Sequence, residues 1–126
     1  MKRLIITSSI LILIVCLGIC SLLYLYHTNE QITQITMTAQ EAVGQGDIKR
    51  AQEQIDALSN LWKKTEPWMS SLVRHNDVDE ISKYMSELHP LLEHNEMGIL
   101  SCELNKIQLI SEHITESETP TFFHIF

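Results

Sequence analysis

A single uncharged apolar run near the start of the chain limits what it can fold into more than any other feature. Residues 4–26 comprise 23 positions without a charged side chain, and 14 of them are Leu, Ile or Val. At about 1.5 Å per residue, a helix of this length spans roughly 34 Å, slightly more than the hydrocarbon core of a bilayer at about 30 Å. The run therefore predicts a transmembrane helix.

The charges that flank this run predict its orientation. Lys2 and Arg3 precede it, whereas the next Lys or Arg is Lys49. Because basic residues are retained on the cytoplasmic side, we expect a cytoplasmic stub and transmembrane anchor within residues 1–27 and an extracytoplasmic domain at residues 28–126. The expected location is the cell membrane, crossed once, with the N-terminus in the cytoplasm.

Two alternatives to an uncleaved anchor are open at this point. A secretory signal peptide has an apolar region of about 7 to 15 residues followed by a small-x-small cleavage site, and no such site lies near Tyr26. The segment Leu17-Gly18-Ile19-Cys20 resembles a lipobox with Cys20 as the lipidated residue, but a small residue normally stands in the place of Ile19. Because the apolar run continues beyond Cys20, an uncleaved anchor is the favoured interpretation.

The remainder of the chain is acidic, which narrows the choice of partners. The chain of 126 residues has 9 Lys and Arg against 16 Asp and Glu, and residues 28–126 alone retain 7 basic and 16 acidic side chains. A surface that neutralises phosphates needs the opposite balance, so we expect no nucleic-acid partner. Of the three cysteines only Cys102 lies outside the apolar run, so no disulfide can form within this domain.

Four segments after the apolar run repeat apolar residues every three or four positions, which is typical of amphipathic helices. These segments are about 28–43, 47–73, 77–94 and 96–116. Short turns join them, so they should pack as a small antiparallel bundle. The expected fold is all-α, with an N-terminal transmembrane helix that runs without a break into this bundle.

Several segment boundaries carry their own signals. Gly44 and Gly46 end the first of these helices, and Asp47 is placed to cap the next one. Asp77, with Glu80 three residues later, resembles a capping box and predicts that the third helix starts at residue 77. The second and third helices therefore each have an expected beginning.

Two prolines fall inside the expected helices. Pro67 removes the hydrogen bond to the Lys63 carbonyl and crowds that turn, so we expect a kink in the second helix and not its end. Pro90 interrupts the third helix in its last turns. The fourth helix is expected to fade within residues 116–120, where the sequence turns polar and reaches a third proline.

Taken together, these features resemble one family of short proteins. Besides the basic start and the apolar run, they are Gly46-Asp47, Trp62 six residues before Trp68, His75-Asn76-Asp77 and the terminal Ile125-Phe126. They look like an uncharacterised family of short single-pass membrane proteins from spore-forming Gram-positive bacteria, a domain of unknown function. The resemblance covers nearly the whole chain and implies a membrane-anchored helical domain, but it implies no reaction.

Six histidines invite a search for a metal or catalytic site. His89 and His94 are five residues apart and diverge by about 140° around a helix, so they cannot share one ion. His89 with Glu93 is one turn apart, and His75 stands beside Asp77, but neither pair matches a known motif. We expect no cofactor, metal or catalytic residue. The alternative is a ligand- or metal-sensing bundle, or a weak hydrolase, using His75 or His89 with Glu93.

A role in protein binding fits these features better. Three Phe and one Ile in the last five residues are too apolar for a free polar terminus, so this tail should pack on the bundle, touch the membrane or engage a partner. The sequence predicts a non-enzymatic module that binds a neighbouring membrane protein or its own copy. The candidate contact residues are Trp62, Trp68, His75, Cys102, Phe122, Phe123, Ile125 and Phe126.

Overall fold

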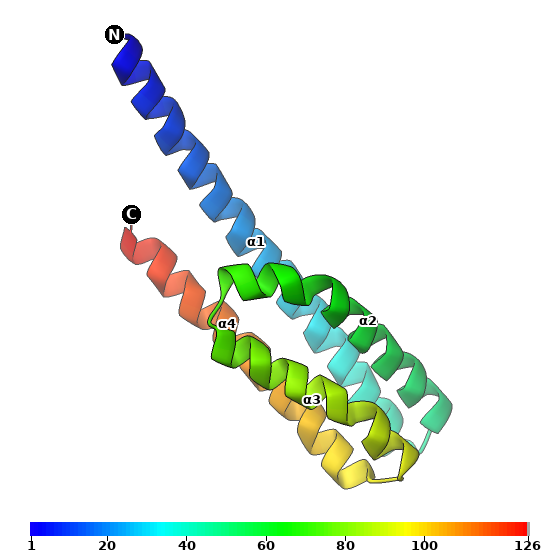
Figure 1. Ribbon diagram of the computed structural model, residues 1–126. Helices are drawn as coiled ribbons and strands as arrows, with labels where there is room; N and C mark the ends of the chain where they lie inside the picture. The colour runs from blue at the N-terminus through cyan, green and yellow to red at the C-terminus, as the bar shows by residue number, and fades with distance from the viewer. Residues whose placement is uncertain (126) are drawn as a thin grey trace.

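The computed structural model describes the backbone of residues 1–125 and the side chains of residues 1–117. Its four helices are α1 (Lys2–Gly44), α2 (Ile48–Leu72), α3 (His75–Glu93) and α4 (Met97–Ile125), and the described residues form no strand. Figure 1 shows the N-terminal part of α1 projecting from an antiparallel bundle to which all four helices contribute. The predicted all-α fold, a long apolar N-terminal helix followed by a helical bundle, is confirmed.

α1 is one uninterrupted helix of 43 residues with two different halves. The apolar half, residues 2–24, projects from the bundle and contains no buried residue. The bundle half, residues 25–44, contributes a single buried face because its buried residues recur every three or four positions. These residues are Leu25, Thr28, Ile32, Thr36, Ala39 and Ala42. The expectation that the apolar helix continues into the bundle without a break is confirmed.

Each helix of the bundle contacts two neighbours. α1 packs against α2 and α4, and α3 packs against the same two helices, so α1 and α3 lie diagonally opposite each other. Burial of a large aliphatic side chain stabilises a fold by about 1.5 to 3 kcal/mol, which makes this shared core the main source of stability. Its most deeply buried aliphatic residues are Ile32, Ile55, Leu58, Val78, Ile81, Leu88, Leu100, Leu104, Ile107 and Ile114.

The bundle has two distinct ends. The proximal end is the one from which the apolar half of α1 projects, and it also holds the turn between α2 and α3; the distal end holds the other two turns (Figure 1). The distal turns use Gly46, with a φ of 74°, and Asn95, with a φ of 55°, two residue types that tolerate left-handed backbone. Asp47 caps α2 as predicted, since its side chain accepts a 3.1 Å hydrogen bond from the Arg50 amide.

Pro67 lies inside α2 without ending it, as expected from the sequence. Figure 1 shows that α2 bends in its C-terminal part, where the proline leaves one backbone carbonyl without its helical donor. Thr65 sits at a position of the apolar stripe and is buried, but its hydroxyl donates a 2.7 Å hydrogen bond to the Leu61 carbonyl. Pro90 likewise lies inside α3, three residues before its end.

Two helix ends correct the sequence predictions. α3 begins at His75 and not at Asp77, because the extended backbone of Arg74 lets its carbonyl accept the Val78 amide and no side chain caps this end. Asp77 therefore lies in the first turn, where its charge still favours the helix dipole. α4 continues to Ile125 and does not fade at residues 116–120. A proline removes one amide donor, and the remaining turns keep their own hydrogen bonds.

Candidate functional site

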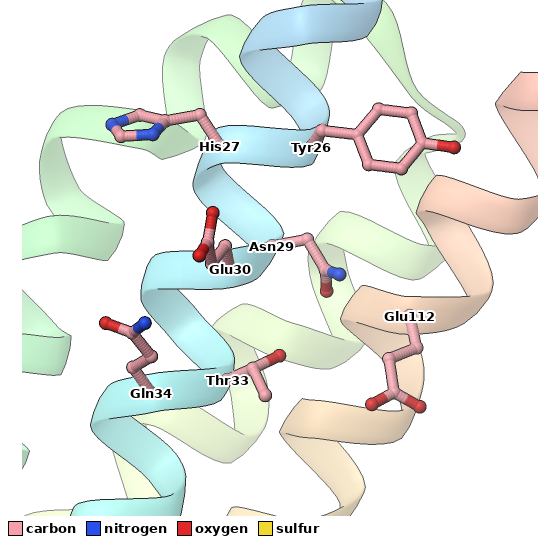
Figure 2. A pocket seen from close by; sticks show the side chains of 7 residues that line it. All are labelled: Tyr26, His27, Asn29, Glu30, Thr33, Gln34 and Glu112. Carbon is pink, nitrogen blue, oxygen red and sulfur yellow. The ribbon is translucent and has the colours of Figure 1, made fainter.

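A polar cleft lies at the proximal end, between α1 and α4. Its volume is about 630 Å³. Figure 2 shows Asn29 and Thr33 pointing from α1 toward α4, whereas His27 and Gln34 point to the other side of α1. The complete lining is Tyr26, His27, Asn29, Glu30, Thr33, Gln34 and Glu112. The sequence analysis missed this cleft, although the polar residues close to the buried face of α1 were a signal for it.

The polar atoms of this cleft are only partly paired. Asn29 Oδ1 accepts a 2.7 Å hydrogen bond from Ser111, and Gln108 donates to Glu112 at 3.4 Å. The Thr33 hydroxyl is buried and has no hydrogen-bond partner. The cleft therefore offers hydrogen-bond acceptors and two carboxylates. Among the described residues, no three His, Cys, Asp or Glu side chains come together in an arrangement that could hold a metal ion.

A smaller apolar pocket lies at the distal end, beside the two turns. It encloses about 120 Å³, room for one apolar side chain, and its rim includes Ile48, which is 48% exposed. The turn residues Gly46 and Asn95 both border it, so the left-handed backbone of the turns shapes the pocket. The complete lining is Ala42, Val43, Gly46, Ile48, Ala51, Asn95 and Met97.

The two tryptophans of α2, both candidate contact residues, occupy opposite environments. Trp62 is buried, and its indole Nε1–H donates a 2.9 Å hydrogen bond to Ser82 Oγ on α3. Ser82 in turn donates a 3.1 Å hydrogen bond to Glu66, so two hydrogen bonds join α2 to α3 through Ser82. Trp68 is 65% exposed. Trp62 therefore belongs to the core of the bundle, and only Trp68 is free to contact something outside it.

His75 and Cys102 are both exposed, at different places. His75 is the first residue of α3 at the proximal end, and its ring makes no hydrogen bond to the described residues. Cys102 lies on α4 in the distal half of the bundle and carries a free thiol. The structure therefore does not bring these two candidate residues together.

His89 forms a hydrogen bond with a residue that the sequence did not predict as its partner. Its Nε2 lies 2.6 Å from Asp56 Oδ1 on α2, and because an ionised carboxylate only accepts, the ring nitrogen donates this bond. Glu93, the expected neighbour one turn away, makes no hydrogen bond with it among the described residues. The sequence could not reveal the pair with Asp56, because 33 positions separate the two residues.

A buried carboxylate lies on α4 at a position of the apolar stripe. Glu103 is only 6% exposed, and Lys106 donates a 3.3 Å hydrogen bond to its Oε1, while its Oε2 has no partner. Lys106 also lies over the ring of Tyr84 on α3, 5.4 Å from its centroid. The hydrogen bond and the charge of Glu103 raise the pKa of the Lys106 ammonium above its ordinary value. Through these contacts, Lys106 links Tyr84 on α3 to Glu103 on α4.

The C-terminal candidates Phe122, Phe123, Ile125 and Phe126 lie outside the described side chains. The backbone of α4 nevertheless extends through residue 125, and Figure 1 shows it running toward the side on which the apolar half of α1 projects. Ten residues of α4 follow Thr115, the last buried residue among the described side chains, and they correspond to about 15 Å of helix. The backbone of α4 thus continues past the last core residue that the structure describes.

Comparison with protein families identifies the family of the chain. A domain of unknown function, DUF4363, matches residues 19–125 of the chain. The chain belongs to the DUF4363 family. The predicted resemblance to a family of unknown function is therefore confirmed. No curated protein and no solved structure matches the chain.

The range of the match shows which part of the molecule the family shares. It begins inside the apolar half of α1 and extends to the last residue of α4. The DUF4363 domain therefore consists of the four-helix bundle together with the end of the apolar helix that enters it. The polar cleft, the distal apolar pocket, the two tryptophans and Cys102 all lie within this range.

Proposed function

We propose that this DUF4363 protein is a membrane-anchored helical module that lies outside the cytoplasmic membrane and acts by binding another protein, without catalysing a reaction. The contrast within α1 carries the proposal. α1 is long and apolar enough to cross a membrane, and its most apolar stretch is not buried at all by the bundle. A core helix of a soluble protein would be buried, so lipid is the surrounding that fits this stretch.

The position of the bundle on α1 supports an uncleaved anchor over a cleaved signal sequence, which passes the same test of length and composition. Leu25 and Thr28 are buried in the bundle, so the core begins where the apolar half ends. Cleavage would have to fall inside an unbroken helix just before its first core residue. An uncleaved α1 instead ties the bundle to the bilayer through a continuous helix.

The charges support the proposed orientation. Lys2 and Arg3 lie at the free end of the apolar half, and the acidic bundle lies at the other end. Basic residues near a membrane-spanning helix favour the cytoplasmic side. The bundle, and with it Cys102, would then face the outside of the membrane.

The distal apolar pocket supports protein binding as the mode of action. It lies at the end of the bundle farthest from the apolar half of α1, and exposed Ile48 forms part of its rim. Protein interfaces gain much of their binding energy from single anchor side chains that fill such pockets. Ile99, near the start of α4, is another half-exposed apolar side chain at this end. The partner would be a neighbouring membrane protein or a second copy of the chain.

Cys102 offers a direct test of both parts of the proposal, because it is the one thiol outside the apolar half of α1. A membrane-impermeant maleimide added to intact protoplasts should label the wild-type chain and leave the Cys102→Ser variant unlabelled. Labelling that requires lysis would contradict the orientation. The reagent should report topology cleanly, since Cys16 and Cys20 lie in the apolar half.

The same thiol tests for a partner. A maleimide that carries a photoreactive group, attached at Cys102 in native membranes, should give one adduct of defined mass after illumination. The Cys102→Ser variant, treated in parallel, controls for attachment elsewhere. A chain that stays a monomer, with no adduct from Cys102 or from thiols introduced at Ile48 and Ile99, would count against a protein-binding role.

A further inference from the structure

Trp68 is the most exposed large apolar side chain on α2, α3 and the described part of α4. It is 65% exposed, whereas Trp62, two turns earlier on the same helix, is 4% exposed. Burial of a large apolar side chain stabilises a structure, and an indole left in water does not make this contribution. Trp68 would therefore gain from contact with an apolar surrounding outside the bundle.

The height of Trp68 along the bundle indicates what that surrounding is. α1 and α2 are antiparallel and are joined at Gly46, and each rises about 1.5 Å per residue from that turn. Trp68 follows Gly46 by as many residues as Tyr24 precedes it. The buried residues agree with this pairing, because Met69 is the last core residue of α2 and Leu25 is the first of α1. Trp68 thus lies where the bundle half of α1 meets the apolar half.

The side chains at this height have the chemistry of a membrane interface. Tyr24 and Tyr26 end the apolar run of α1, and Trp and Tyr are the residues enriched at the boundary between lipid and water. An indole suits this layer because its apolar ring prefers lipid while its N–H can still meet water or a headgroup. Tyr24, Tyr26 and Trp68 therefore form a group of aromatic residues from two helices at one level.

The corner between α2 and α3 adds a second indication. Residues 67–76 contain no acidic residue, although the chain carries a net charge of −7, and they include exposed Arg74. A basic side chain close to a bilayer is attracted by anionic headgroups. Figure 1 shows this corner at the end of the bundle from which α1 projects, and α4 also runs on toward that side.

We propose that the proximal end of the bundle lies in the headgroup layer of the bilayer that holds α1, with Trp68 inserted as its interfacial anchor. This inference rests on the proposed membrane anchor and adds a second contact with the membrane. A bundle held only by α1 could tilt together with that helix relative to the bilayer. A second contact, through Trp68 on α2, fixes the tilt and holds the distal pocket at a set distance from the membrane.

The two tryptophans provide a matched test. The full-length chain is reconstituted in vesicles of phosphatidylcholine and phosphatidylglycerol, as Trp62→Phe, which keeps Trp68, and as Trp68→Phe, which keeps Trp62. In the first variant we expect emission at shorter wavelength than that of an exposed indole, loss of most intensity with lipids brominated on the upper acyl chain, and little quenching by acrylamide. In the second variant, neither brominated lipid nor acrylamide should quench, because Trp62 is buried.

Two other results would overturn the inference. Strong quenching of Trp68 by acrylamide without an effect of brominated lipid would place it in water. Protection of Trp68 from both quenchers would mean that protein covers it, in these vesicles a second copy of the chain. If Trp62→Phe fails to fold, the difference between the wild-type and Trp68→Phe emission isolates Trp68 instead. Flotation separates the two proposals, since a chain that does not float with the vesicles lacks the anchor itself.

Discussion

The two halves of α1 belong to one continuous helix, yet they are built for different surroundings. In residues 2–24, large apolar side chains surround the helix and none of them is buried. In residues 25–44, the buried positions narrow to one face, and exposed polar residues such as Glu30, Gln34 and Glu41 cover the other. The distribution of apolar side chains around the helix therefore separates a half that is apolar on all sides, as the proposed membrane anchor requires, from a half that packs against helical neighbours.

The buried face of the bundle half also differs in the size of its residues. Thr28, Thr36, Ala39 and Ala42 account for four of its six buried positions, so α2 and α4 can approach α1 closely. The buried hydroxyl of Thr36 is satisfied within its own helix, because it donates 2.9 Å hydrogen bonds to the carbonyls of Ile32 and Thr33. Close helix packing, and not a large apolar area on α1, holds this half in place.

The largest expected effect comes from placing charge in the apolar half. Each arginine near the centre of a membrane-spanning helix costs about 2.5 to 3.5 kcal/mol, whereas each Leu or Ile contributes only about −0.3 to −0.6 kcal/mol. Leu13→Arg combined with Leu17→Arg should therefore release most of the chain from membranes. Sedimentation of the membrane fraction after an alkaline wash measures the retained share.

The matched control places two arginines in the bundle half. Gln34 and Met37 are both exposed on α1, so Gln34→Arg combined with Met37→Arg should leave membrane retention unchanged. If both double variants are retained to the same extent, the apolar half does not hold the chain in lipid. The proposed membrane anchor would then be wrong.

A smaller effect is expected from deleting apolar volume in each half. Ile32 is 1% exposed in the core, and Ile32→Ala should destabilise the bundle by about 2 to 5 kcal/mol through lost burial and a cavity. Ile12 is 63% exposed, so Ile12→Ala should leave bundle unfolding unchanged. Urea unfolding in detergent micelles, followed by tryptophan emission, measures both. Equal losses would mean that the apolar half packs on the bundle.

The sequence contained most of the fold because periodicity is a local signal. Apolar spacing predicted the four helices, and Asp47 marked the start of α2 as the structure has it. The difference between the two tryptophans was also readable: Trp62 falls on the apolar stripe with Leu58, and Trp68 falls off it. Turns around the helix, counted from the core positions, are enough to separate a buried indole from an exposed one.

The specific contacts between helices could not be predicted from apolar periodicity. Two hydrogen-bonded pairs, His89 with Asp56 and Ser82 with Trp62, depend on the axial offset between α2 and α3. That offset is set by the length of each turn and by the bend at Pro67, neither of which periodicity encodes. The cleft between α1 and α4 was missed for the same reason, since it needs Glu112 beside the first turns of the bundle half.

The smallest predicted effect concerns the point where the two halves of α1 meet. Ser111 is 4% exposed and donates a 2.7 Å hydrogen bond to Asn29, the polar link between α4 and the start of the bundle half. Ser111→Ala leaves the Asn29 carbonyl oxygen without its donor and should cost about 1 kcal/mol. Urea unfolding measures the loss.

Ser86→Ala is the matched control for Ser111→Ala. Ser86 is exposed and bonds only to the Lys83 carbonyl of its own helix, so its loss should change stability by less than about 0.5 kcal/mol. A loss at Ser111 larger than at Ser86 would show that a specific polar contact fixes the level at which α1 leaves the bundle. Equal losses would mean that apolar packing around Leu25, and not this hydrogen bond, sets the level.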